Sequence, residues 1–414
     1  WVADEKKAFQ ERELSYMVAE CMREPGWKGL NVDVGEIRDL TDHQREELTK
    51  ATIGGSLALL TGFAGTGKSY SLVRLLRYLL PIFTTNHIAI AAPTGRAAVR
   101  ISELMSEVGL DIGASTIHSL LGVVNSDSGG WHFRHGPDNP LPYKLIIVDE
   151  LSMCALDLMY DLFTARDKNC LILGLGDIAQ LPPVGHGAPL RDMISANVPT
   201  GCLTEIHRNA GGIVRACSKI RQGQSFDYED NLHLISRNEP ESQIEAMISV
   251  VDAVSHKLKL DPIWEFQIIC TNNKNSPLDR KVLNDVLQKH LNPSPLVASC
   301  KFRLKDKVVN TKNGWLPASE QFWQIPEKER EGSMVNDDGR IYCANGDFGR
   351  VIRVEKNFFE VSLQAPKRIV IVPFGKQEDE GDDKDATSAG CLWELGYAVT
   401  AHKSQGAQFP VAVV

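Results

Sequence analysis

Residues 57–80 read LALLTGFAGTGKSYSLVRLLRYLL and join an apolar run, a glycine-rich turn and an amphipathic stretch without a gap. This order predicts a strand, a loop and a helix. The turn has the spacing G-x-x-x-x-G-K-S of a phosphate-binding loop, in which backbone N–H groups converge on phosphate oxygens. A chance glycine-rich turn is the alternative, and the strand and helix on either side argue against it. The sequence predicts binding of a nucleoside triphosphate with Mg²⁺ by Gly62, Gly65, Thr66, Gly67, Lys68 and Ser69.

A second strong pattern is the hydrophobic run of residues 144–148, which ends in two carboxylates. A strand that delivers acidic side chains at its carboxyl end supplies what a phosphate-loop NTPase needs. We expect Asp149 to enter the Mg²⁺ shell and Glu150 to polarise the attacking water. Core packing does not account for both this pair and the phosphate loop upstream of it.

A third predicted strand, residues 170–176, leads into a loop that contains Gln180 and two prolines. The prolines forbid a direct helix, so the loop is stiff, and Gln180 could sense the γ-phosphate or orient water. Further on, Arg208 could reach the transferring phosphate as an arginine finger does. A surface arginine near a helix start is the alternative for Arg208.

Two segments upstream of the phosphate loop are predicted to form helices. Residues 1–35 are predicted to form an N-terminal helical extension, with a helix from about Asp4 to Met22 and a break at Pro25. Thr41 and Gln44 have the spacing of a capping box, which explains both as a helix start. A glutamine here could also read the adenine edge, because its amide is both donor and acceptor. The residues alone leave both readings open.

Hydroxyl and amide groups follow several other predicted strands. Residues 88–92 end in a Pro-Thr-Gly turn, which would present polar groups at the carboxyl edge of a sheet. Thr116 begins a short predicted helix and could be only its N-cap. Residues 122–142 predict a β-hairpin whose aromatics could stack on bases or on one another across the strands. The run 400–406 is a plausible phosphate-contacting surface or an exposed polar helix.

Composition narrows the class of protein. The chain has 414 residues, enough for two or three domains, and 43% of them are hydrophobic. No apolar run approaches the roughly 18 residues of a membrane span, and the N-terminus is too charged for a secretory signal. Nine cysteines without a C-x-x-C pair favour reduced thiols in a cytoplasm-like compartment and argue against structural zinc. Because the first residue is Trp, we expect that part of the start is missing.

Net charge does not decide whether nucleic acid is a partner. The formal charge is −8, which by itself favours other partners. Residues 378–385 hold six acids and one base, so −5 of this charge comes from one segment. The remainder is close to neutral and neither supports nor excludes nucleic acid.

The motifs together resemble the superfamily 1 DNA helicases of the RecD/Dda type. The resemblance covers about residues 40–410, and its set of motifs is highly specific. The matching segments are GFAGTGKS (62–69), AAPTGRAA (91–98), STIHSLLG (115–122), LIIVDELSM (145–153), GDIAQLPPV (176–184), LTEIHRN (203–209) and GYAVTAHKSQG (396–406).

The resemblance implies an α/β fold with two RecA-like P-loop NTPase domains and ATP between them. The first domain would span residues 36–222, with residues 122–142 as a pin that splits the duplex. The second would span 223–299 and 391–414, with 300–390 as an inserted SH3-like β-barrel. It also implies an ATP-dependent helicase that moves 5′→3′ on single-stranded DNA and acts at single-strand/duplex junctions. We expect a monomer in the cytoplasm of a prokaryotic or phage-infected cell, associated with the nucleoid, with replication, recombination or repair proteins as partners.

By the same resemblance, Gln44 would contact adenine, and Lys68, Glu150, Gln180 and Arg208 would serve catalysis. Gln405 and Gly406 would approach the nucleotide from the second domain, and Ser69 and Asp149 would hold Mg²⁺. The residues expected to contact DNA are Pro93, Thr94, Thr116, His118, Thr271, Asn272, Thr400, His402 and Lys403.

One departure leaves alternatives open. The family carries a final arginine motif, and this chain stops at Val414 before reaching it. We expect that motif to lie beyond the given residues. An RNA helicase of the same superfamily, or a regulatory clamp that binds nucleotide and nucleic acid without unwinding, are the alternatives. No cluster of nuclease carboxylates is evident.

Overall fold

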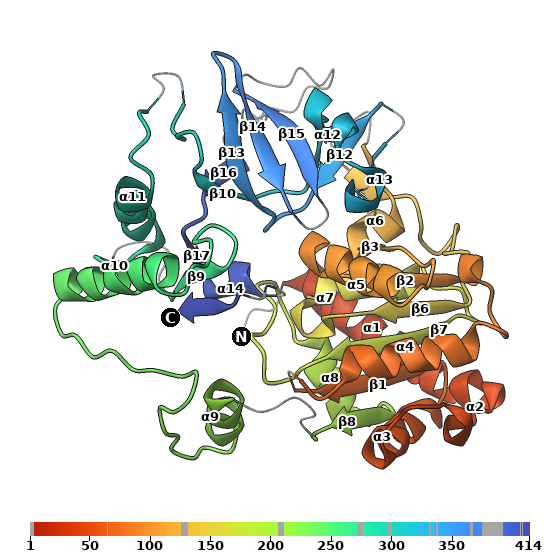
Figure 1. Ribbon diagram of the computed structural model, residues 1–414. Coiled ribbons are helices and arrows are strands. Elements are labelled where there is room, and N and C mark those ends of the chain that lie inside the picture. The colour runs from red at the N-terminus through yellow and green to blue at the C-terminus, as the bar shows by residue number, and fades with distance from the viewer. Residues whose placement is uncertain are drawn as a thin grey trace. The chain divides into compact units, whose positions relative to one another are not determined.

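The computed structural model describes residues 4–63, 65–125, 131–205, 211–271, 276–296, 300–330, 333, 335–336, 338–364, 367–374, 392–405, 407 and 409–414. The chain forms two compact units, Trp1–Leu234 and Ile235–Val414 (Figure 1). Their division, between Leu234 and Ile235, lies 12 residues beyond the predicted boundary between 222 and 223. Each unit is described by itself below.

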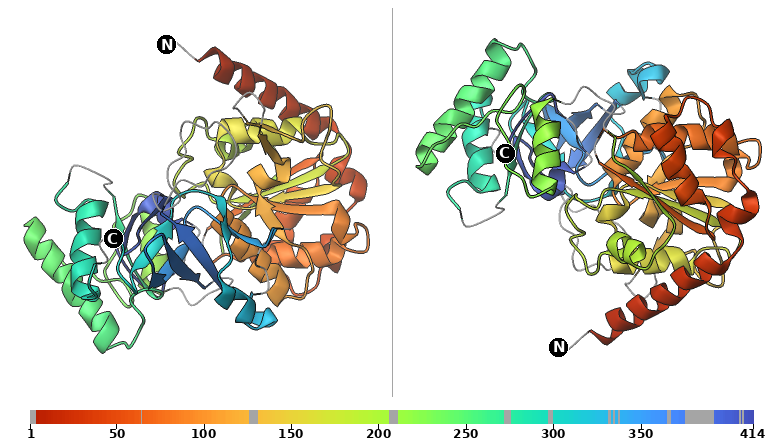
Figure 2. Two further views of the ribbon diagram at one scale, coloured as in Figure 1. Left: turned by 90° about the horizontal axis from the view of Figure 1, so that it is seen from above. Right: turned by 90° about the horizontal axis from the view of Figure 1, so that it is seen from below.

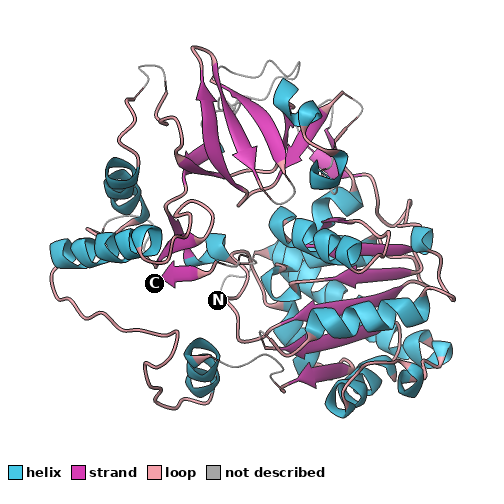
Figure 3. Ribbon diagram, in the orientation of Figure 1, coloured by secondary structure: helices cyan, strands magenta, loops and turns pink. Residues whose placement is uncertain are grey.

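The first unit is built on a parallel sheet of six strands, shown in Figure 3 with helices on its faces. The strands are β1 (Leu57–Gly62), β2 (Ile88–Ala92), β3 (Ala114–Thr116), β6 (Leu145–Val148), β7 (Leu171–Gly176) and β8 (Thr200–Leu203). Their order is β3-β2-β6-β7-β1-β8, and every pairing is parallel. The predicted parallel α/β core is confirmed.

Side chains that alternate along the strands enter two separate cores. In β1, Ala58 and Leu60 join one apolar cluster, and Leu57 and Leu59 join the other. Because both faces are covered, the strands are continuous hydrophobic runs. Helices α2 (Gly26–Leu30), α3 (Asp42–Thr52), α4 (Lys68–Leu79) and α5 (Gly95–Glu107) contribute to the first cluster. Helices α1 (Glu5–Arg23), α6 (Ile117–Leu121), α7 (Leu156–Thr164) and α8 (Pro189–Ser195) contribute to the second.

The predicted N-terminal helix is present as α1, capped by Asp4. It contacts α7, and its buried Leu14 and Val18 enter the second cluster. The Cys21 carbonyl accepts a hydrogen bond of 2.7 Å from the Ser56 backbone, next to β1. Figure 2 shows α1 from two sides. The C-terminal half of α1 is therefore part of the core of the first unit.

The remaining elements of this unit are short. Strands β4 (Val123–Asn125) and β5 (Trp131–Phe133) pair antiparallel, so the predicted hairpin is present, and residues 126–130 between them lie outside the described residues. Its use as a pin stays a prediction. Helix α9 (Gly212–Arg221) follows β8, and 3₁₀ turns occupy Val34–Glu36, Thr85–His87 and Leu151–Met153.

The second unit begins as an α/β structure. Its parallel strands are β9 (Phe266–Cys270), β17 (Ala398–Thr400) and β18 (Val411–Val413), in the order β17-β9-β18. Helices α10 (Pro240–His256) and α11 (Arg280–Leu291) pack on this sheet, and α14 (Ala401–Ser404) follows β17. These elements form a second parallel sheet, and its assignment to a RecA-like domain stays a prediction.

An antiparallel β region lies within the second unit. Its main sheet has the order β15-β14-β13-β10-β16, beside the pair β11-β12. The strands are β10 (Lys307–Asn310), β11 (Gly314–Pro317), β12 (Arg340–Cys343), β13 (Phe348–Val354), β14 (Phe358–Leu363), β15 (Arg368–Pro373) and β16 (Trp393–Leu395), with helices α12 (Glu320–Gln324) and α13 (Glu327–Arg330). The predicted short antiparallel strands are confirmed, whereas closure into an SH3-like barrel stays a prediction. The acidic run 378–385 lies outside the described residues.

Within the described ranges, no helix combines the length and apolar character needed to cross a membrane.

Candidate nucleotide-binding site

Three neighbouring strands of the first unit bring the predicted nucleotide residues to one edge. The phosphate loop follows β1, Asp177 follows β7, and Asp149 follows β6, and these strands are adjacent in the order β6-β7-β1. Parallel strands end at the same edge, where open α/β sheets bind ligands. The carboxylates of Asp177, Glu150 and Asp149 all favour the charged form of Lys68, which agrees with this placement.

The phosphate loop has a backbone suited to an anion. Gly65 and Gly67 have φ angles of 82° and 89°, and Gly67 is the N-cap of α4. Such left-handed glycines turn successive N–H groups toward one point at a helix N-terminus. A Cβ on Gly62 would lie 2.7 Å from the Leu203 carbonyl oxygen, so only glycine fits there. Ala64 lies outside the described residues.

Lys68 lies against its own loop. Its Nζ donates to the Gly62 carbonyl and, at 3.2 Å, to the Phe63 carbonyl. Burial lowers the pKa of Lys68, and the carboxylates of Asp177, Glu150 and Asp149 oppose this shift. The ammonium group is thus held beside the loop that would receive the phosphates.

The two acidic residues after β6 share a sharp turn. Glu150 has φ 52°, a left-handed conformation that is strained for a residue with a side chain. Its N–H donates to Asp149 Oδ1 at 2.9 Å. Burial raises the pKa of both carboxyls, and the charge of Asp149 raises that of Glu150 further. A raised pKa makes Glu150 a stronger base than a surface glutamate.

The donors available for a metal fit Mg²⁺. Ser69 is exposed at the start of α4, which follows the loop after β1, and Asp149 directly follows β6 in the same sheet. Mg²⁺ prefers hard oxygen ligands and uses one or two protein groups together with substrate phosphates. Among the described residues, no group of three or more His, Cys, Asp or Glu could form a dedicated metal cage.

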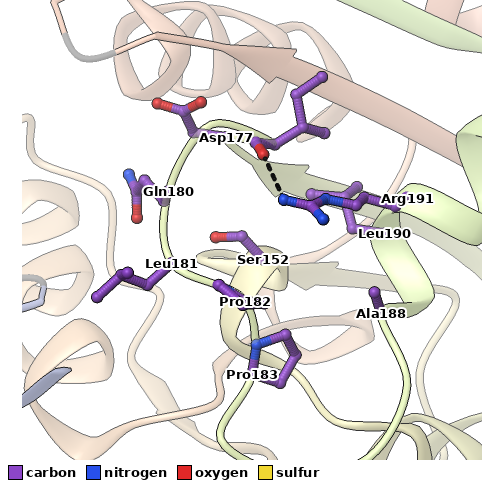
Figure 4. Close-up of a pocket in the computed structure, with 10 residues that line it drawn as sticks. Ser152, Asp177, Gln180, Leu181, Pro182, Pro183, Ala188, Leu190 and Arg191 are labelled. Atoms are coloured by element: carbon purple, nitrogen blue, oxygen red, sulfur yellow. Dashed lines mark hydrogen bonds between the residues drawn. The ribbon is translucent and has the colours of Figure 1, made fainter. Parts of the chain in front are cut away.

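The loop after β7 carries Gln180 and lines a small pocket, shown in Figure 4 with Ser152 and Arg191 among its lining residues. Asp177 is 1% exposed and its Oδ1 accepts the Ala179 N–H at 2.9 Å. The Gln180 N–H donates to the Asp177 carbonyl at 3.1 Å. Asp177 therefore shapes the Gln180 loop. The sequence reasoning missed it, although its position directly after a buried strand was a usable signal.

Gln44 is buried in the capping box that its spacing predicts. The Gln44 N–H donates to Thr41 Oγ1 at 3.2 Å, and the Thr41 N–H donates to Gln44 Oε1 at 3.1 Å. The structural role is confirmed, and the adenine contact stays a prediction.

Two residues expected at DNA are helix caps in the first unit. Thr94 Oγ1 accepts the Ala97 N–H at 3.3 Å, and Thr116 Oγ1 accepts the Ser119 N–H at 3.1 Å. Thr94 follows β2 and Thr116 ends β3, so both lie at the same sheet edge as the nucleotide residues. Burial lowers the pKa of His118, whose ring centre lies 6.0 Å from that of Phe133.

The second unit also has a threonine helix cap at the end of a strand. Thr400 caps α14 by accepting the Lys403 N–H at 3.4 Å, and Lys403 Nζ pairs with Glu394 at 3.2 Å. Thr271 and His402 are exposed. Arg208, Asn272 and Gly406 lie outside the described residues, so their predicted roles are not tested by the structure.

The site of the first unit defines a P-loop NTPase, since a phosphate loop, an aspartate–glutamate pair and a loop with a glutamine follow adjacent parallel strands. Comparison with known proteins agrees: residues 44–186 match a family described as an AAA domain. The chain is 29% identical over 378 residues to the ATP-dependent RecD2 DNA helicase of Deinococcus radiodurans, covering 90% of this chain and 44% of that protein. It is 32% identical over 401 residues to the RecBCD enzyme subunit RecD of Mycolicibacterium smegmatis, covering 91% of this chain and 66% of that protein. The chain belongs to the superfamily 1 helicases of the RecD/Dda type.

The chain thus spans about half to two thirds of the length of these relatives. A solved structure of a Pif1 helicase from Bacteroides, in complex with ADP-AlF3 and ssDNA, is similar at 19% identity and a TM-score of 0.48, covering 91% of this chain and 86% of that one.

Proposed function

We propose that the chain is the motor core of an ATP-dependent DNA helicase. It would hydrolyse ATP with Mg²⁺, move 5′→3′ along single-stranded DNA and open duplex DNA at junctions. The observation that carries the proposal is the meeting of Lys68, the Asp149–Glu150 pair and the Gln180 loop at three adjacent strand ends. The relative from Deinococcus radiodurans, which is named as a DNA helicase, supports DNA as the track.

Each residue of the site has a part in hydrolysis. Lys68 would place positive charge beside the phosphates, and Glu150, with its raised pKa, would take the proton from the attacking water. Gln180 would orient that water from the loop shaped by Asp177. Mg²⁺, held by Ser69 and Asp149, would neutralise charge on the phosphates. Arg208, Gln405 and Gly406 are proposed to sense the γ-phosphate.

The track would be gripped by groups at the strand ends. In the first unit these are Pro93, Thr94, Thr116 and His118, which follow β2 or lie at and just after β3. In the second unit they are Thr271, Asn272, Thr400, His402 and Lys403, which follow β9 or lie at the end of β17 and in α14. Hydroxyl, amide and N–H groups at such edges suit phosphate contacts, which position a protein without reading sequence. We propose a cytoplasmic monomer that acts at single-strand/duplex junctions.

Two assays test this function. ATP hydrolysis is measured without nucleic acid, with single-stranded DNA and with RNA of the same sequence, and DNA is expected to stimulate most. Unwinding is then compared on duplexes with a 5′ tail, a 3′ tail or blunt ends, and only the 5′-tailed substrate is expected to open. Stimulation by RNA alone would favour an RNA helicase. Nucleotide binding without turnover would favour a clamp, and unwinding of the 3′-tailed substrate alone would contradict the polarity.

A further inference from the structure

A cation that the predicted site does not include lies over the phosphate loop. Arg221 is the last residue of α9. Its guanidinium carbon lies 4.0 Å from the centre of the Phe63 ring. Its Nη2 donates to Asp177 Oδ2 at 3.4 Å. Phe63 is the second residue of the phosphate loop, and Asp177 opens the Gln180 loop. A single side chain therefore contacts both loops of the nucleotide site.

Asp177 needs such a partner. Its side chain is 1% exposed, whereas that of Arg221 is 24% exposed. A carboxylate removed from water is costly unless a cation or several donors accompany it. Lys68 is another nearby cation, but it is the group expected to move to the phosphates. When Lys68 serves the nucleotide, Arg221 remains as the counter-charge of Asp177.

The contact with Phe63 acts on the loop backbone. The Phe63 carbonyl accepts hydrogen bonds from Lys68 Nζ at 3.2 Å and from Thr66 Oγ1 at 2.8 Å. The position of Phe63 therefore influences both the lysine and the threonine of the phosphate loop. A planar guanidinium stacks on an aromatic face, and an ammonium cannot reproduce that planar contact.

We propose that Arg221 is a positioning residue of the nucleotide site. Through Phe63 and Asp177 it holds the phosphate loop and the Gln180 loop in the arrangement that binds nucleotide. This inference rests on the proposed function for its turnover readout, whereas nucleotide affinity tests it separately.

The test compares Arg221→Ala and Arg221→Lys with a control on the same helix, Arg215→Ala. Arg215 pairs with Glu229 at 2.8 Å and also with Asp230, neither of which belongs to the phosphate loop or the Gln180 loop. The dissociation constant of the fluorescent nucleotide mant-ADP and the KM and kcat for ATP are measured. Arg221→Ala is expected to raise the dissociation constant and KM about tenfold, because an uncompensated buried carboxylate and an unsupported loop remain. Arg221→Lys should recover part of the loss through its charge.

A double-mutant cycle with Phe63→Leu separates positioning from general stability. If Arg221 acts through the stack, Arg221→Ala costs less affinity in the Phe63→Leu background than in the wild type. Full additivity, or Arg221→Ala affinities equal to those of Arg215→Ala, would overturn the proposal. Thermal melting identifies a misfolded Arg221→Ala, in which case Arg221→Lys takes its place in the cycle.

The two proposals fail in different ways. A wild-type chain that binds mant-ADP but shows no DNA-stimulated hydrolysis would overturn the proposed function, while the affinities would still decide the role of Arg221. A wild-type chain that does not bind mant-ADP would overturn both.

Discussion

Both compact units bury charged side chains, but the two regions treat them in opposite ways. In the first unit, burial raises the pKa of Asp149 and Glu150 at the open edge of the parallel sheet. In the second, Asp306 is fully buried and accepts hydrogen bonds from four donors, those of Gln288, Asn292, Arg303 and Tyr397. Gln288 lies on α11 and Asn292 directly follows it, whereas Arg303 lies shortly before β10 and Tyr397 directly precedes β17.

We call the sheet edge that carries Asp149 and Glu150 the binding edge, and Asp306 with its four donors the joint. The two regions differ in what surrounds the buried carboxylate. Asp306 directly precedes β10, and its hydrogen bonds tie the antiparallel β region to the α/β part of the second unit. The carboxylate of Asp306 therefore has a structural role. The burial of Tyr397 and the nearby carboxylate of Asp306 raise the pKa of that phenol, which therefore stays protonated and donates. At the edge of the first unit, burial disfavours the charged form of both Asp149 and Glu150, so a bound cation would stabilise that form.

The largest expected effect is the loss of the phosphate-loop cation. Lys68→Ala should lower DNA-stimulated ATP hydrolysis by about 10³-fold, because phosphate charge is no longer stabilised. Phosphate release measured with saturating single-stranded DNA checks this. Lys28→Ala, an exposed lysine on α2, is the control and should retain wild-type turnover. Hydrolysis by Lys68→Ala within threefold of wild type would remove the basis of the assignment.

Glu150→Gln should lower hydrolysis by about a hundredfold, because the general base is lost. The same change should raise the melting temperature of the nucleotide-free protein, since it removes a buried charge that Asp149 repels. Such a gain of stability with a loss of activity is typical of a functional carboxylate. Calorimetry and ATPase assays on one preparation check both parts, and a lower melting temperature would contradict this account of the binding edge.

Asp306→Asn makes the same exchange of a carboxylate for an amide in the joint. Here we expect stability to fall, whereas for Glu150→Gln we expect it to rise. The new NH₂ group would face donors instead of accepting from them, at a cost of about 3 kcal/mol in the stability of the second unit. Hydrogen exchange in β10 and α11 measures this, with the exposed Asp285→Asn on α11 as control. Mant-ADP affinity should stay within twofold of wild type. Unchanged hydrogen-exchange protection of β10 would show that Asp306 does not hold the two parts of the second unit together.

A smaller effect concerns pH. Because the folded-state pKa of Glu150 lies above its unfolded value, the folded protein binds more protons between the two values. Its contribution to stability is therefore present at low pH and falls as pH rises from the ordinary carboxyl value of about 4 through the raised pKa. The stability difference between Glu150→Gln and wild type should accordingly grow across this window. Urea unfolding at a series of pH values measures this difference. A stability difference that shrinks as pH rises would contradict the raised pKa of Glu150.

The smallest expected effect separates the two readings of Gln44. Thr41→Ala removes the cap hydroxyl and should cost about 1 kcal/mol, without removing the Gln44 amide. Gln44→Ala removes both the capping box and the amide. If Gln44 also reads adenine, only Gln44→Ala should reduce the preference for ATP over GTP, measured as the ratio of KM values. Equal ratios in both variants would leave Gln44 as a cap alone.

Local patterns account for the parts of the site that sequence predicts well. The strand, loop and helix around Lys68, and the strand that directly precedes Asp149, each follow from one contiguous stretch of residues. The capping box at Thr41 is likewise local. Such features depend on residues within a few positions of one another, so periodicity and spacing reveal them.

Contacts between distant segments escaped prediction. The pairing of Arg221 with Asp177 joins residues 44 positions apart, and no pattern marks either as a partner of the other. The placement of β1 between β7 and β8 is equally invisible in the sequence, because strand order depends on how whole elements pack. The role of Gln44 at adenine remained open because it depends on a ligand.

The capped threonines have a consequence for mutational scanning. Thr94, Thr116 and Thr400 each begin a helix at the end of a strand and accept a backbone N–H. An alanine scan at these positions would fray three helices, and the resulting loss of DNA binding could be mistaken for three lost contacts. Serine keeps the acceptor and deletes only a methyl group, so a threonine-to-serine series would separate the helix start from the grip on the strand.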